Sequence, residues 1–311
     1  MAGIGFELKK LFVGGGAIRK ARAYAYASIV CAGTMLLAMV LLIGIQRLAL
    51  LSGVNERQRE ALVAMVVYAM LFSMLLAAIL QTLISRYVSD MIYRDTPDRV
   101  IPSLIGASLL LMVPGGIAYG ILLLLSPEIP AVDRALNWVL FMELIPVWLQ
   151  MAYITAVKDY RRILRVFAAG VLAALVLGAA LILSGQKTET PLLAVLVVGY
   201  GVMLTGFMRV LLRYFPSGSG SAFAFIEWFS RTPQLALVGF FGMAGVFVHL
   251  IVMWFGPLGE SVTGLFRHAP TYDPAAFYAY LVTLPASVNF VVSVEVNFYR
   301  EYRRYFDAVN G

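Results

Sequence analysis

Residues 24–46 read YAYASIVCAGTMLLAMVLLIGIQ, and this stretch decides the fold class. It contains no charged residue over its 23 positions. At about 1.5 Å of rise per residue in an α-helix, a run of this length crosses the roughly 30 Å hydrocarbon core of a bilayer. The apolar region of a cleavable signal peptide is shorter, about 7–15 residues, so we predict a transmembrane helix.

The composition of the whole chain is typical of a membrane protein with several spans. Of its 311 residues, 61% are hydrophobic and 13% are charged, and the mean hydropathy is +0.86. Soluble domains carry about a quarter charged residues. The net charge of +7 indicates topology rather than affinity for nucleic acid, because the cations gather in loops on one side of the predicted spans. We expect an all-α polytopic membrane protein that binds no nucleic acid.

Residues that usually carry catalysis or bind metal ions are scarce. The single cysteine, Cys31, excludes an intrachain disulfide and a metal site built from several cysteines. The two histidines, His249 and His268, belong to no HExxH motif, and the chain has no GxxxxGK[ST] phosphate-binding loop. The sequence therefore predicts a protein that is not an enzyme and that has no cofactor and no metal site.

Eight apolar runs are predicted to cross the membrane. Five cations precede the first run, beginning with Lys9 and Lys10, and such cations usually remain in the cytoplasm. With both termini cytoplasmic, the inner segments hold 18 of the 24 Lys and Arg residues and the outer segments hold 6. The predicted spans are residues 24–46, 61–85, 101–125, 135–157, 163–183, 191–212, 234–256 and 274–297.

The spans and the polar stretches between them divide the chain into five segments. Residues 1–23 suit a cytoplasmic interfacial segment, and residues 24–213 form a lobe of six helices. Residues 214–233 combine a Pro/Gly/Ser hinge with an aromatic, amphipathic helix on the inner surface. Residues 234–297 hold two further spans of a partial second lobe, and residues 298–311 form a basic, aromatic cytoplasmic tail.

Glu143 is the only acidic residue deep inside a predicted span. A charge at that depth costs about 2.5–3.5 kcal/mol, so such residues generally face a bundle interior or water. Gln150 lies two helical turns further along, on the same side, with Pro146 between them. We interpret this stripe as the lining of a cavity that contacts sugar or couples protons. The alternative is a protonated glutamic acid that bonds to another helix for packing alone.

Three more polar residues within predicted spans are candidates for the same cavity. His249 lies toward the outer half of its span, as Glu143 does, and the two could pair, although a lone membrane histidine is more often a structural hydrogen-bonding residue. Asn289 and Ser293 in the last span could bind hydroxyl groups, and holding helices together is their more common use.

Small residues and prolines inside the spans predict close packing and bends. Gly170, Ala174 and Gly178 recur every fourth residue, which is typical of a face where two membrane helices approach closely. Pro114, Pro146 and Pro285 are predicted kinks, because proline removes a backbone donor from the helix. At Pro114 two glycines follow directly, so we expect a kink or an unwound turn there.

Both ends of the chain resemble a known family. Residues 1–11 read MAGIGFELKKL, residues 23–27 read AYAYA at the entry to the first span, and residues 298–308 read FYREYRRYFDA. Together they resemble the PelG family of exopolysaccharide exporters, in the multidrug, oligosaccharidyl-lipid and polysaccharide (MOP) flippase superfamily. The resemblance implies two six-helix lobes and about twelve spans, of which this chain would supply about eight, as a truncated member.

The resemblance also implies a function and partners. It indicates a transporter in the bacterial inner membrane that moves a cationic, hexosamine-rich biofilm polysaccharide outward by alternating access. Its partners would be the polysaccharide, a cytosolic glycosyltransferase, other membrane subunits of a Pel-type synthase, and the lipid bilayer. Two alternatives stay open. One is a non-transporting scaffold that docks the glycosyltransferase through residues 214–233 and the basic tail, and the other is a lipid-linked oligosaccharide flippase.

Overall fold

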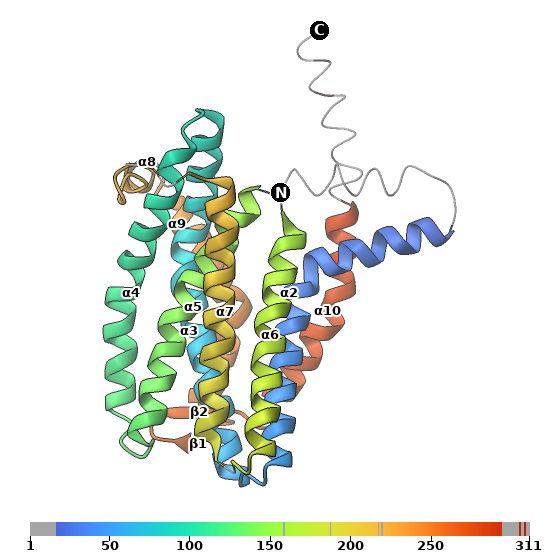
Figure 1. Ribbon diagram of the computed structural model, residues 1–311, viewed down its shortest axis with the longest axis vertical. Coiled ribbons are helices and arrows are strands. Elements are labelled where there is room, and N and C mark those ends of the chain that lie inside the picture. The colour runs from blue at the N-terminus through green and yellow to red at the C-terminus, as the bar shows by residue number, and fades with distance from the viewer. Residues whose placement is uncertain are drawn as a thin grey trace. The chain divides into compact units, whose positions relative to one another are not determined.

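The structure is a computed structural model that describes residues 17–157, 159–186, 188–216, 218, 220–293, 305 and 308 (Figure 1). Long helices account for most of these residues. They are α2 (Ala17–Leu51), α3 (Glu56–Tyr93), α4 (Val100–Leu124), α5 (Ala131–Val157), α6 (Tyr160–Leu183), α7 (Glu189–Tyr214), α9 (Gln234–Phe255) and α10 (Asp273–Ser293). The short elements are the 3-10 helix η1 (Pro97–Arg99), α8 (Ile226–Arg231), β1 (Glu260–Thr263) and β2 (Phe266–His268).

Seven helical segments of the described part are long and apolar enough to cross a membrane, and they lie in α2, α3, α4, α5, α6, α7 and α9. This confirms the prediction of an all-α polytopic membrane protein. The eighth predicted span corresponds to α10, which is helical from Asp273 to Ser293. The last four residues of that span lie outside the described part, so its passage through the membrane stays a prediction. The predicted segments 1–23 and 298–311 also lie largely outside it.

The chain forms two compact units. The larger unit is Met39–Asp273, and the smaller unit combines Met1–Ala38 with Pro274–Gly311. Within the larger unit, α5 packs against α3, α4 and α7, and α6 packs against α7. The helix that the sequence assigned to a partial second lobe, α9, packs along α3 in this same unit. The side chains of α5 are therefore surrounded by helices on several sides.

The first predicted outer loop, residues 47–60, is much shorter in the structure. α2 continues through Arg47 to Leu51, and α3 already begins at Glu56. Asn55 caps α3, because its side-chain oxygen accepts a hydrogen bond from the Gln58 backbone N–H at 2.9 Å. The sequence boundary was wrong because hydropathy marks where the apolar run ends, whereas a helix continues into water as long as its backbone groups remain paired.

The proline and glycine motif of the third predicted span does not unwind its helix. α4 is one continuous helix from Val100 to Leu124 with Pro114 inside it, so the unwound turn is absent. The glycines instead allow close packing against α5, since a Cβ on Gly116 would stand 2.7 Å from the Met142 Sδ. Pro146 and Pro285 likewise lie inside helices, and their kinks stay predictions.

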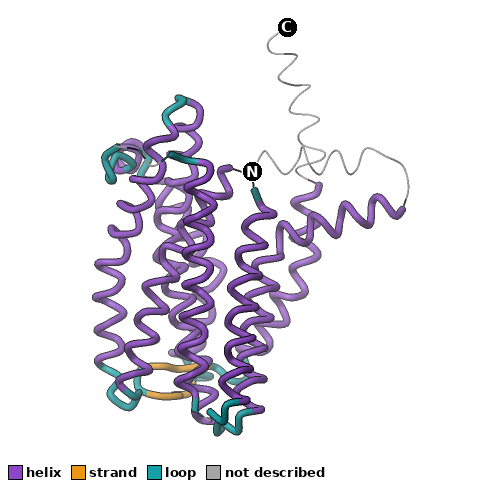
Figure 2. Tube along the Cα trace, in the orientation of Figure 1, coloured by secondary structure: helices purple, strands orange, loops and turns teal. Residues whose placement is uncertain are grey.

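A β-hairpin occupies the segment that was predicted to be an outer loop, residues 257–273. β1 pairs antiparallel with β2, and the two strands are orange in Figure 2. Gly264 in the turn has a φ of +52°, a conformation that glycine adopts readily. The hydroxyl of Tyr68 on α3 donates to the Arg267 carbonyl at 3.1 Å and accepts from the Arg267 N–H at 3.0 Å. The Ser126 hydroxyl accepts from the Leu265 N–H at 3.1 Å. The hairpin therefore rests on one end of the bundle, which we call the hairpin end.

Candidate functional site

The candidate site centres on Glu143, midway along α5. Its Oε1 lies beside α7, at 3.5 Å from the position that a Cβ on Gly201 would take. Its Oε2 is buried and has no hydrogen-bond partner among the described residues. Because buried polar atoms are nearly always hydrogen-bonded, a carboxylate oxygen in this condition indicates a place where water or a ligand supplies the missing donor.

Gln150 repeats this condition two turns further along α5. Its side chain is fully buried, at 0% exposure, and neither its Oε1 nor its Nε2 has a hydrogen-bond partner in the described part of the chain. One turn beyond it, the Tyr153 hydroxyl is paired with the Ser103 hydroxyl at 3.0 Å. Glu143 and Gln150 of the predicted stripe therefore have buried polar atoms without partners among the described residues, whereas Tyr153 is paired, and a ligand-binding role of the stripe stays a prediction.

The other predicted site residues belong to other helices. His249 is on α9, and one of its partners is Tyr272, whose hydroxyl lies 3.1 Å from the histidine Nδ1. Asn289 and Ser293 lie at exposed positions of α10, which belongs to the smaller unit. Their participation in one cavity with Glu143 stays a prediction.

A second polar cluster ties α3, α4 and α5 together, and sequence reasoning missed it. The Tyr119 hydroxyl donates to the Asn137 Oδ1 at 2.6 Å, and the Asn137 Nδ2 donates to the Met65 carbonyl at 3.0 Å. Tyr119 also stacks on Phe141, with ring centroids 4.2 Å apart. Each of these hydrogen bonds joins two groups of the protein, so the cluster stabilises the packing of the three helices. Asn137 within an apolar run was the only available signal.

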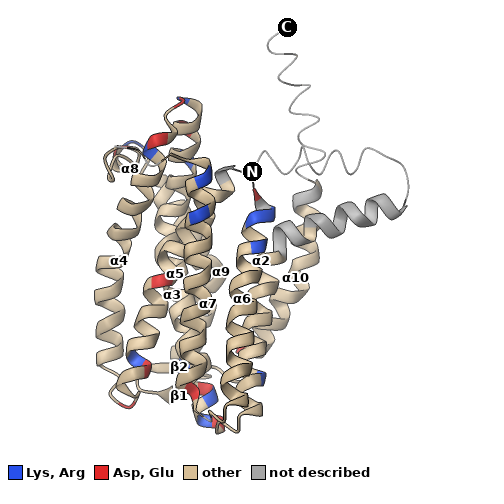
Figure 3. Ribbon diagram, in the orientation of Figure 1, with Lys and Arg blue, Asp and Glu red and all other residues tan. Residues whose placement is uncertain are grey.

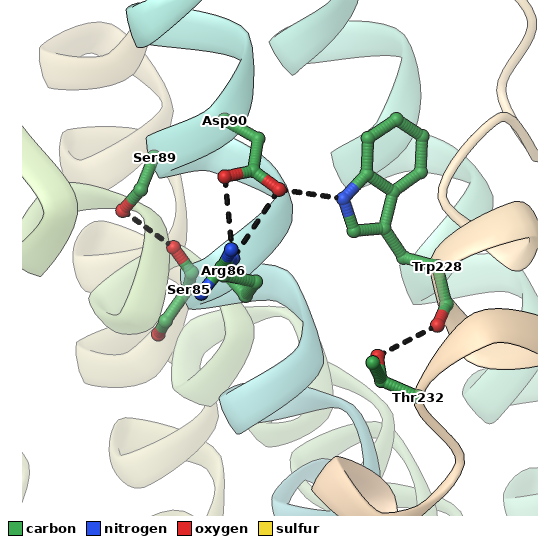
Figure 4. A network of polar contacts seen from close by, with 6 residues as sticks. All are labelled: Ser85, Arg86, Ser89, Asp90, Trp228 and Thr232. Carbon is green, nitrogen blue, oxygen red and sulfur yellow. Dashed lines mark hydrogen bonds and ion pairs between the residues drawn. The ribbon is translucent and has the colours of Figure 1, made fainter.

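The linker, residues 214–233, is attached to the opposite end of the bundle, which we call the α8 end. The Trp228 Nε1 donates to the Asp90 Oδ2 of α3 at 2.8 Å, and Arg86 forms an ion pair with the same carboxylate at 3.2 Å (Figure 4). The Trp228 ring meets Tyr87 edge-on at 5.0 Å. The helix predicted here is only six residues long, and this anchoring explains how so short a helix keeps its place.

Charged residues gather at the two ends of the larger unit, whereas α5 carries an acidic residue within its length (Figure 3). Within the described ranges, no group of three or more His, Cys, Asp or Glu side chains could hold a metal ion. The chemistry of the site is therefore that of hydrogen bonding and of a single carboxylate inside a membrane helix.

A protein-family profile described as "PelG: Putative exopolysaccharide Exporter (EPS-E)" matches residues 1–311. No curated protein and no solved structure matches the chain. The match extends over both terminal motifs and all the membrane helices, and it agrees with the resemblance that those motifs indicated. The chain belongs to the PelG family of exopolysaccharide exporters.

Proposed function

We propose that this protein carries a biofilm exopolysaccharide across the bacterial inner membrane, from the cytoplasm outward, by alternating access. The observation that carries the proposal concerns Glu143 and Gln150, which lie well inside α5, a helix that is apolar and long enough to span the bilayer. Their side chains bear buried polar atoms with no hydrogen-bond partner among the described residues. The same is true of Asp133, but Asp133 lies in the first turn of the helix. Hydrocarbon offers these groups no hydrogen bond, so a polar passage beside α5 explains them. Membership of an exporter family supports the same conclusion.

The two side chains have complementary chemistry for a sugar polymer. The Glu143 carboxylate accepts hydrogen bonds from hydroxyl or ammonium groups, and the Gln150 amide both donates and accepts. A negative charge on the path favours a cationic, hexosamine-rich cargo of the Pel type. The partners that supply and receive such a polymer would be a cytosolic glycosyltransferase and further membrane subunits of a synthase.

Replacing Glu143 with Gln tests the proposal, because it keeps the size of the side chain and removes its charge. We expect secreted polymer to fall at least tenfold, while the amount of protein in the membrane and its co-purification with the glycosyltransferase stay unchanged. Glu227→Gln is the matched control, since Glu227 is an exposed residue of α8 that pairs with Arg231. Normal export by Glu143→Gln would refute a role for this carboxylate.

One observation favours a second function, that of a scaffold. Phe223, Ile226 and Phe229 are 46%, 41% and 41% exposed and lie beside the anchored Trp228. A fixed apolar patch on the cytoplasmic side suits a protein partner such as the glycosyltransferase. If the chain is only a scaffold, replacing Phe223 and Phe229 with Ser abolishes both co-purification and export, whereas Glu143→Gln changes neither.

A further inference from the structure

The exposed side of α7 carries polar residues among apolar ones, although the helix is long and apolar enough to span the membrane. Gly201, Thr205 and Arg209 recur every fourth residue, so they lie on one side of the helix. Thr205 and Arg209 are exposed. The opposite side is packed inside the bundle, where Tyr200, Met203 and Phe207 are each 0% exposed. The helix thus separates an apolar buried side from an exposed side, on which Thr205 and Arg209 lie together with the apolar Val198 and Leu212, at 46% and 49% exposure.

This side of α7 meets the candidate site at Gly201. A Cβ on Gly201 would lie 3.5 Å from the Glu143 Oε1, which is an ordinary van der Waals distance. Gly201 carries only a hydrogen atom in place of a Cβ. The Glu143 carboxylate therefore lies against the same side of α7 that carries Thr205 and Arg209. Glu143, Gly201, Thr205 and Arg209 form one row, which leads from the middle of α7 toward its end near Tyr214.

The hydrocarbon of the lipid bilayer is an unfavourable environment for the polar groups of this row. An arginine or a carboxylate costs about 2.5–3.5 kcal/mol within the hydrocarbon, and lipid tails offer no hydrogen bonds. The Thr205 hydroxyl donates to the Gly201 carbonyl at 2.9 Å, which uses its proton and leaves its oxygen able to accept. Arg209 alone could extend to the interface along its aliphatic stem. That explanation does not apply to Glu143, which lies further from either end of its helix.

We propose that this row, the α7 track, is in contact with water and guides the hydroxyl-rich polymer along the cytoplasmic half of the membrane. The proposal rests on the proposed function and specifies where the cargo passes. Carboxylate, hydroxyl and guanidinium groups at one-turn intervals offer acceptors and donors in sequence, which suits a chain of hydroxyl groups that must exchange partners as it moves. Gly201 keeps the carboxylate accessible, since any side chain there would stand against it.

Cysteine labelling in inside-out membrane vesicles tests the α7 track. The starting protein is Cys31→Ala, which removes the chain's only cysteine. Thr205→Cys is then compared with Leu172→Cys on α6, an apolar position in another span that is 61% exposed. The probe is a charged methanethiosulfonate, which reacts with thiols in water and only slowly with thiols in lipid. Arg209→Cys serves as a second track variant where Thr205→Cys reduces the amount of protein.

We expect Thr205→Cys to react at least tenfold faster than Leu172→Cys, and to react more slowly when polymer synthesis is switched on. Labelling as slow as that of Leu172→Cys refutes the track, even where Glu143→Gln still abolishes export and the proposed function stands. Fast labelling that is insensitive to polymer synthesis refutes the passage of cargo along the track. The experiments therefore distinguish a failure of the α7 track from a failure of the proposed export function.

Discussion

One of the contacts that attach the linker to α3 is a hydrogen bond that can be removed almost in isolation. Trp228→Phe keeps an aromatic ring against Tyr87 and deletes the N–H that donates to Asp90 at 2.8 Å. A hydrogen bond to a charged group contributes about 1.5–3 kcal/mol. Because the Asp90 side chain is 26% exposed, water partly replaces the lost donor, and we take the lower value, about 1.5 kcal/mol.

Limited trypsin digestion of inside-out vesicles measures this change. Arg231 is the only trypsin site within the linker, and cleavage there requires the short α8 to detach from α3. When opening and closing are fast relative to cleavage, the rate follows the population of the open form. If the attached form of α8 loses about 1.5 kcal/mol of stability relative to the detached form, the cleavage rate rises roughly tenfold. Asp90→Asn, which keeps an acceptor oxygen and loses the charge, should give a smaller increase.

Trp138→Phe is the matched control for this prediction. Its Nε1 donates to the Gly116 carbonyl at 2.9 Å, so the substitution deletes a similar bond between α5 and α4, away from the linker. Cleavage at Arg231 should stay at the wild-type rate in that variant. If Trp228→Phe is also cleaved at the wild-type rate, the bond to Asp90 does not hold the linker. If both variants are cleaved faster, the cause is a general loss of stability.

Two further predictions concern the packing of the larger unit. Tyr119→Phe leaves the buried Asn137 Oδ1 without its donor, which should lower the free energy of unfolding by about 1–3 kcal/mol and lower the Tm in detergent. Tyr278→Phe is the control, because Tyr278 is 66% exposed and its substitution should leave the Tm unchanged. Gly170→Val should strongly reduce the amount of folded protein seen by size-exclusion chromatography, because a Cβ at Gly170 would already stand 2.6 Å from the Gly199 carbonyl oxygen. The control is Leu172→Ala on the same helix. Equal amounts of folded protein in the two variants would contradict the close approach of α6 and α7.

Features that depend on local sequence could be predicted well. The apolar runs predicted the helices that can span a membrane, because the bilayer requires a long apolar segment with its own backbone hydrogen bonds. The four-residue spacing of Gly170, Ala174 and Gly178 predicted a close-packing face, and α6 meets α7 there through Gly170 and Ala174. The terminal motifs predicted the family that the profile match confirms.

Features that depend on pairing between distant residues could not be predicted. The hairpin of residues 260–268 contains too few residues for a clear alternating pattern, and it is held by Tyr68 and Ser126, which are more than a hundred residues away. The Trp228–Asp90 bond likewise joins residues that are 138 positions apart. Neither sequence segment carries a signal of its partner.

The sequence by itself determined that this chain lies in a membrane, which of its segments form the long apolar helices, and which residues of α5 are too polar for lipid. Hydropathy is a property of each segment, so it can be read without knowing the neighbours. Only the tertiary structure decided which of those polar residues are paired. It joined Tyr153 to Ser103, left the Glu143 Oε2 and the Gln150 amide without hydrogen-bond partners among the residues that the structure describes, and set Glu143 against Gly201 of α7. Hydrogen bonds between helices require atoms to meet within about 3 Å, and that condition is met only after the helices have packed.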